Sequence, residues 1–93
     1  MDKIAEKLFE RNGKKYNFHK AAEEFLELAL VLNQKLLKPT KVNEQQIIDE
    51  IGDCELRLKV LKKYFDSKKI KKRILYKTKK FNSYIENNTY DKI

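Results

Sequence analysis

The sequence predicts an all-α protein, because few residues turn the chain and its apolar residues recur at helical spacing. Only two Gly and one Pro occur among 93 residues, so the elements should be few and long. Apolar residues that follow each other every three or four positions, as a helix face requires, include Ile47, Ile51, Cys54, Leu58 and Leu61. A chain of this length forms one small domain and buries only part of its surface. We therefore expect a small helical bundle, a single domain over residues 1–93, that is completed by oligomerisation.

The first elements should be a short arm and a long helix. Residues 1–16 are expected to form an N-terminal arm or short helix, whose helical part ends near Asn12-Gly13. The first main helix is expected over residues 17–37. It should end there because Pro39 disfavours helix at the residue before it and lacks a backbone donor.

Two further helices complete the predicted fold. Asn43 and Gln46 have the spacing of a capping box, so the second main helix should span residues 43–65. Asp66 or Ser67 can cap a basic third helix over residues 67–86, and residues 87–93 should form a frayed tail. We expect the two long helices to lie antiparallel, with the third helix beside them.

The net charge of the chain is +8, and it is unevenly distributed. Residues 18–58 hold five Lys or Arg and eight acids (5 − 8 = −3), whereas residues 59–93 hold twelve Lys or Arg and three acids (12 − 3 = +9). A basic surface is typical of nucleic-acid binding. A composition rich in Lys, Asn, Ile and Tyr is also what an AT-rich coding sequence favours. The acidic middle of the chain needs a separate explanation.

Two clusters of carboxylates lie within otherwise apolar helical segments. Glu23, Glu24 and Glu27 occur in AAEEFLELAL, and Asp49, Glu50 and Asp53 occur in IIDEIGDCEL. On a helical wheel the first cluster lies roughly opposite an apolar face made by Phe18, Ala21, Ala22, Phe25, Ala29, Leu32 and Leu36. Because unpaired buried charge is costly, these acids need a compensating partner.

The spacing within each cluster suits a divalent cation. Residues three apart are neighbours on a helix surface, so Glu24 with Glu27, and Glu50 with Asp53, can each bind one cation together. Mg²⁺ prefers oxygen ligands and often bridges to substrate phosphates, and Mn²⁺ is a substitute for it. The alternative is that the acids form salt bridges with the basic third helix. Spacing alone does not decide between the two.

A resemblance to a known family favours the metal site. The motif reads Glu24-x-x-Glu27, then 50 − 27 − 1 = 22 residues, then Glu50-x-x-Asp53. It resembles the signature of the MazG-like, all-α nucleoside triphosphate pyrophosphohydrolases. EEFLEL is similar to the family's Glu-Glu-x-x-Glu-Leu, and DEIGDCELRLKVL is similar to its Glu-x-x-Asp segment. The resemblance covers about residues 15–85, and the short, single-module phage type is closest in size. Gly52 stands where the family more often has Ala, and should allow close approach of another helix.

The resemblance implies an activity and assigns roles to residues. The activity is Mg²⁺-dependent hydrolysis of NTPs or dNTPs to the monophosphate and pyrophosphate by a homodimer or homotetramer, for control of a nucleotide pool or removal of unwanted nucleotides. By motif position, the metal ligands would be Glu24, Glu27, Glu50 and Asp53. Glu23 and Asp49, each beside a ligand, would orient the ligands or act as general base. Lys77 and Lys80, in a stretch that resembles the late basic helix of short phage members, would contact substrate phosphates.

Two other functions stay open at this point. The chain is a basic helical nucleic-acid-binding protein if residues 59–80 carry its function, although this leaves the acids unexplained. Alternatively, the chain is a catalytically inactive, oligomeric relative of the MazG-like enzymes that keeps their fold without their turnover.

The remaining signals concern the compartment. Cys54 is the single cysteine and lies in an apolar run, so we expect a small buried side chain and neither a disulfide within the chain nor a cysteine-built metal site. Nothing resembles a signal peptide, and no apolar run approaches a membrane span. We expect a protein of the cytoplasm, of the host cytoplasm if a phage encodes it, without a membrane partner.

Overall fold

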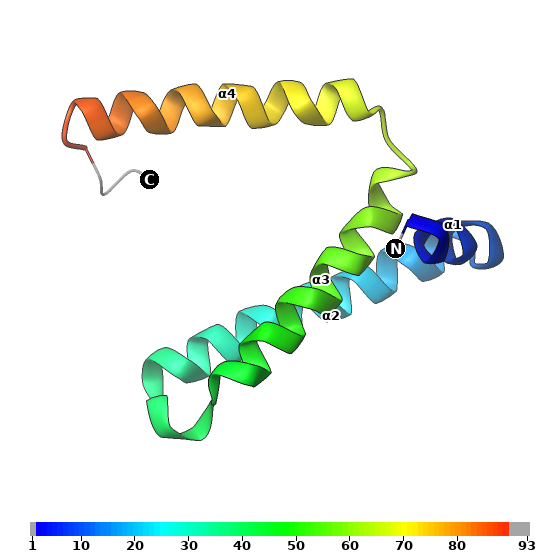
Figure 1. Ribbon diagram of the computed structural model, residues 1–93, viewed down its shortest axis with the longest axis horizontal. Coiled ribbons are helices and arrows are strands. Elements are labelled where there is room, and N and C mark those ends of the chain that lie inside the picture. Colours follow the sequence, from blue (N-terminus) through cyan, green and yellow to red (C-terminus); the bar gives the residue numbers. More distant parts are fainter. Residues whose placement is uncertain (1, 90–93) are drawn as a thin grey trace.

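The computed structural model describes residues 2–89, and this part of the chain is all helical (Figure 1). The elements in chain order are α1 (Asp2–Arg11), α2 (Lys14–Leu37), the short 3₁₀ helix η1 (Pro39–Lys41), α3 (Glu44–Lys62) and α4 (Ser67–Glu86). No strand occurs within residues 2–89. The predicted all-α class is confirmed.

The helix starts follow the predicted capping chemistry. The Asn43 side chain accepts a hydrogen bond from the Gln46 backbone N–H at 2.9 Å, and the Gln46 side chain accepts one from the Asn43 backbone N–H at 2.9 Å. This reciprocal pair satisfies two amides that the first turn of α3 leaves free. Asp66 caps α4 by accepting from the Lys68 backbone N–H at 2.9 Å. Both predicted caps are confirmed.

Two boundaries differ from the prediction. α2 begins at Lys14 rather than at residue 17, after Gly13, whose backbone is extended and offers no side-chain cap. α3 ends at Lys62 rather than at residue 65, so Tyr64 and Phe65 belong to the connection that leads to α4. Of the expected frayed tail, residues 90–93 lie outside the described residues. Thr89 is tied back to α4, because its N–H donates to the Tyr84 carbonyl at 2.8 Å.

α2 and α3 lie side by side and form a helical hairpin closed by η1 (Figure 1). Near the turn, the Lys35 ammonium donates to the Val42 carbonyl at 2.9 Å. In the middle, the Cys54 thiol donates to the Glu24 carbonyl at 3.2 Å. At the open end, α1 crosses the hairpin, with Ala5 and Val60 each only 1% exposed. These contacts fix which residues of α2 face α3.

Only one edge of the apolar face expected from the sequence packs on α3. Ala21 is buried in this interface, and Glu24, Leu28 and Val31 beside it are half-buried. By contrast, the expected apolar face is exposed at Phe18, Phe25, Leu32 and Leu36, the last to 79%. The helix is therefore rotated so that Glu24 lies at the α2–α3 interface and a row of large apolar side chains remains open.

α4 stands apart from the rest of the chain. It makes no packed interface with α1, α2 or α3, and it extends from the end of α3 as a separate arm (Figure 1). The radius of gyration is 16.5 Å, whereas a compact chain of this length has about 12 Å. No helix among the described residues is long and apolar enough to cross a membrane.

Candidate metal centre

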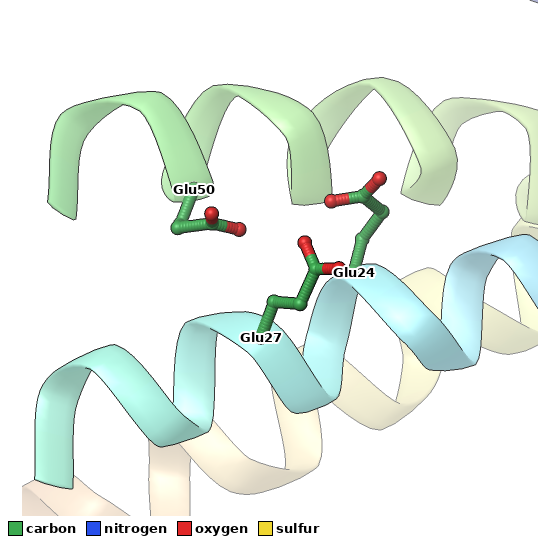
Figure 2. Close-up of side chains that lie close together, drawn as sticks. All are labelled: Glu24, Glu27 and Glu50. Carbon is green, nitrogen blue, oxygen red and sulfur yellow. The ribbon is translucent and has the colours of Figure 1, made fainter. Parts of the chain in front are cut away.

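Three carboxylates meet between the two helices of the hairpin. Glu24 and Glu27 on α2 and Glu50 on α3 each offer an oxygen, and these oxygens all lie within 4.8 Å of one another (Figure 2). The oxygens around one octahedral Mg²⁺ are about 3 to 4 Å apart, given Mg–O distances of about 2.1 Å. The three side chains therefore need only small shifts to bind one cation together.

Two features place these side chains together: the spacing of the acids along α2 and the alignment of α3 against α2. Glu24 and Glu27 are three residues apart and so are neighbours on the surface of α2. The hydrogen bond from the Cys54 thiol to the Glu24 carbonyl fixes the level at which α3 passes α2. Glu50 lies one helical turn before Cys54 and therefore comes level with Glu27 across the interface (Figure 2). The small buried side chain of Ala21 keeps the two helices close.

Gly52 has no part in this close approach. A Cβ atom at position 52 would meet nothing within 4 Å, and the residue is exposed. The close approach expected at Gly52 is therefore not made within this chain, because the residue faces away from α2.

The electrostatics of the cluster disfavour its charged form in the absence of a cation. Burial is the largest cause that raises the pKa of Glu24, followed by the charges of Glu27 and Asp53. The pKa of Glu50 is raised by the same causes in the same order. The contact of each with the Glu27 carboxyl raises both pKa values further. Like charges held together in a partly shielded site retain protons unless a cation replaces them.

One oxygen of Glu24 and one of Glu50 are left without a partner. Both Oε2 atoms are shielded from solvent, and neither accepts a hydrogen bond within the described chain. An unsatisfied shielded carboxylate oxygen is costly, so native structures normally pair it or bind a metal with it. Carboxylate oxygens in this number are a donor set that fits Mg²⁺ or Mn²⁺.

The structure brings the fourth predicted ligand near the other three without making it a member of the cluster. Asp53 is exposed, and its oxygens are not among those within 4.8 Å. Its charge nevertheless raises the pKa of both Glu24 and Glu50. Asp53 therefore stands at the edge of the cluster, one helical turn beyond Glu50.

Glu23 and Asp49, predicted to orient ligands or act as base, have partners on their own helices. Glu23 is 3.1 Å from the His19 ring and 3.3 Å from the Lys20 ammonium, whose charge offsets its own. Asp49 accepts a hydrogen bond from the Gln45 side-chain amide at 2.7 Å, which leaves its charge uncompensated. The two residues thus differ in whether a cationic side chain lies beside them.

Lys77 and Lys80, predicted to contact substrate phosphates, are not brought to the acids within one chain. Both lie on α4, which does not pack on the hairpin. The Lys77 ammonium stands over the Phe81 ring at 4.9 Å, and that of Lys80 stands 5.9 Å from both the Tyr76 and the Tyr84 rings.

Arg57 is a residue of interest that the sequence did not single out for phosphate binding. It follows Glu50 and Asp53 at positions i+7 and i+4, which places the three on one side of α3. Its Nη1 atom is shielded from solvent and has no hydrogen-bond partner among residues 2–89. The spacing of residues 50, 53 and 57 was the signal that could have identified it.

Comparison of the chain with known protein families, with curated proteins and with solved structures finds no match to any of them. The double acidic motif and the geometry of the cluster are therefore the grounds on which a function can be argued.

Proposed function

We propose that the protein is a Mg²⁺-dependent nucleoside triphosphate pyrophosphohydrolase that acts as a homodimer or homotetramer. The observation that carries this proposal is the meeting of Glu24, Glu27 and Glu50 within 4.8 Å, with shielded oxygens that lack a partner. The resemblance of the double motif to the MazG-like enzymes supports the same reaction. Glu24, Glu27 and Glu50 would hold the metal, and Asp53 would join them after a change of side-chain rotamer.

The reaction exchanges one bond for another at the α-phosphorus of the substrate. A water oxygen forms the new bond to this phosphorus, and the bond from the phosphorus to the oxygen that bridges to the β-phosphate breaks. The bridging oxygen leaves with pyrophosphate, and the attacking water gives up a proton. Bound Mg²⁺ supplies Lewis-acid polarisation of phosphoryl oxygens and lowers the pKa of a bound water.

The side chains of this chain supply the remaining tasks. Asp49 is the better candidate for the proton acceptor, because the one hydrogen bond that its carboxylate accepts from residues 2–89 comes from a neutral amide. Glu23, which is paired with Lys20 and contacts His19, would keep the first turn of the acidic segment in place. The Arg57 guanidinium, shielded and unpartnered, would pair with a phosphate oxygen of the substrate.

The test is pyrophosphate release from a panel of NTPs and dNTPs in Mg²⁺, in Mn²⁺ and in EDTA. We expect release that requires the metal and that is lost in Glu50→Gln. The matched control is Glu44→Gln, which removes an exposed acid of the same helix outside the cluster and should keep wild-type turnover. Absence of release from every nucleotide, or equal turnover in the two variants, would remove the proposal.

Nucleic-acid binding is the second candidate function, and the detached basic arm favours it. α4 contains a single acid, Glu86, against the basic side chains of Lys68, Lys69, Lys71, Lys72, Arg73, Lys77, Lys79 and Lys80. DNA affinity that falls steeply with salt and does not change in Glu50→Gln would favour this function.

A further inference from the structure

The hairpin has two faces of opposite character. One face carries the exposed apolar row of α2 and continues onto α3 at Ile51 and Leu58, both more than 40% exposed. It contains a hollow lined by Phe18, Ala21, Ala22, Phe25, Leu61 and Phe65. By helical periodicity, the acids Glu27 and Asp53 lie on the other face of the hairpin. A single chain therefore leaves a continuous apolar surface in water.

The apolar surface continues into the elbow between the hairpin and α4. Phe65 lines the hollow on the hairpin and also a second hollow, which is formed with Tyr64, Asp66, Lys69, Ile70 and Arg73. From Ile70 the surface runs along α4 as a stripe of Ile70, Ile74 and Phe81, which line one shallow hollow with Lys77. α4 thus turns an apolar stripe toward a space that its own chain does not fill.

A basic ridge borders this stripe. Arg73, Lys77 and Lys80 follow each other at i, i+4 and i+7, so they share one side of α4 beside Ile70 and Phe81. The acidic face of the hairpin has a corresponding border, since Leu26 and Leu30 flank its acids and are 70% and 57% exposed. The two surfaces carry opposite charge, and each has exposed apolar side chains beside its charged residues.

We propose that the hairpin of a second copy of this chain lies in the elbow. The apolar faces of the two hairpins pack against each other, and α4 of each copy crosses the acidic face of the other. Pairing of two α4 arms is disfavoured because both are strongly basic, and a nucleic acid would leave the apolar stripe in water.

The path of the chain leaves α4 uncovered by its own hairpin. α4 diverges from the hairpin and does not pack on it, so the chain extends 47 × 39 × 22 Å along its principal axes (Figure 1). The arrangement is reciprocal, as a two-fold dimer requires, because each copy supplies one elbow and fills the other.

The consequence is a composite site, and this step rests on the proposed function. The acids Glu24, Glu27 and Glu50 come from one copy, and the phosphate-binding cations Arg73, Lys77 and Lys80 come from the other. A triphosphate would then lie between a cation-binding cluster and a basic helix that one chain alone does not bring together.

The composite site is tested by mixing two inactive variants. Glu50→Gln removes the acid function, and the triple variant Arg73→Ala, Lys77→Ala, Lys80→Ala removes the basic ridge. Each alone should lose pyrophosphate release. Co-expression should recover about a quarter of wild-type activity, because half of the dimers are mixed and each mixed dimer has one intact site. A mixture as inactive as its components, or a triple variant with wild-type turnover, would overturn the proposal.

The dimer itself is tested without catalysis, so its failure can be distinguished from failure of the proposed reaction. Sedimentation should show wild-type dimers or larger assemblies, and Ile74→Glu should weaken association at least tenfold. Leu75→Glu is the matched control, because Leu75 is equally exposed on the same helix but lies off the stripe, and it should associate like wild type. A monomeric wild type, or equal effects of the two variants, would overturn the proposal.

Discussion

Two groups of polar side chains lie between helices of this chain, and they differ in charge and in the partners that the fold gives them. At the open end of the hairpin, Asn17 is 1% exposed, and its amide nitrogen donates to the Tyr64 hydroxyl at 2.8 Å and to the Leu8 carbonyl at 3.2 Å. In the middle of the hairpin, Glu24 and Glu50 each keep a shielded oxygen without a partner. The Asn17 amide nitrogen joins three segments of the chain, although its Oδ1 atom, like these two carboxylate oxygens, is shielded and has no partner among residues 2–89. The two groups therefore differ mainly in charge, because the Asn17 side chain is neutral whereas Glu24 and Glu50 bring like charges together, as a binding site does before its ligand arrives.

The largest effect expected from this comparison is on catalysis, at Glu24. Glu24→Gln should lower pyrophosphate release by about 100-fold or more, because it removes a metal ligand. The same change should leave the thermal stability of the metal-free protein equal or higher, because it removes one of several like charges. Turnover and thermal unfolding measured on the same samples would check both parts. A parallel loss of stability and activity would make Glu24 a structural residue.

Asn17→Ala should have the reverse pattern. We expect a loss of about 1 to 3 kcal/mol in the free energy of unfolding, because the change removes the hydrogen bonds from the Asn17 amide to the Tyr64 hydroxyl and to the Leu8 carbonyl, of which the latter keeps only the Asn12 N–H. Denaturant unfolding would measure it, with exposed Asn82→Ala as the control. Turnover per folded molecule should stay near the wild-type value. A loss of turnover beyond the folded fraction would contradict the separation of the two groups.

A smaller effect concerns pH. The pKa values of Glu24 and Glu50 are raised above their ordinary value of 4.5, so the folded state binds protons more tightly than the unfolded state. This contribution to stability is fully present below about pH 4.5, and it is lost as pH rises through the raised pKa values. In metal-free buffer, the wild type should therefore lose stability relative to the Glu24→Gln, Glu50→Gln double variant between pH 4.5 and 8.

Thermal unfolding of both proteins over this range would measure the difference, and Mg²⁺ should restore the wild type alone at pH 7.5. If the thermal stability of the two proteins changed with pH in parallel, repulsion between the Glu24 and Glu50 carboxylates would not be what destabilises the metal-free protein.

The smallest expected effect is at Gly52, which lies beside the acids in sequence but faces away from them. Gly52→Ala should stabilise the protein by about 0.5 to 1 kcal/mol, because Ala restricts the unfolded chain and nothing within 4 Å obstructs its Cβ. Denaturant unfolding would show the gain, and turnover should not change. Destabilisation would mean that a neighbour, such as a second copy, lies closer to α3 than the single chain shows.

Local rules predicted most of the helices. Pro39 ends α2, and Asn43 and Asp66 begin α3 and α4, because capping depends on residues that are close in sequence. The helix that begins after Gly13 was placed too late, since no side chain marks its start. The motif spacing also predicted that Glu24, Glu27 and Glu50 meet, because a hairpin register follows from the lengths of its helices.

The rotation of α2 and the position of α4 could not be predicted from the sequence. The apolar face that includes Phe18, Ala21 and Phe25 looked like the inner face, yet of these three only Ala21 is buried. Glu24, from the predicted acidic face, is half-buried beside it. Periodicity identifies an apolar side without telling whether it packs within the chain or against another molecule. The edge position of Asp53 and the isolation of Arg57 depend on side-chain rotamers, which spacing does not determine.

The hydrogen bond between Cys54 and Glu24 gives the protein an intrinsic reporter. Cys54 is the single thiol of the chain, it is buried, and its pKa is raised by burial and then by the charge of Glu24. A thiol-specific reagent at neutral pH can therefore modify it only when α2 and α3 separate. The rate of labelling of the unaltered protein measures how often the hairpin opens, and any cation or nucleotide that joins the two helices should slow it.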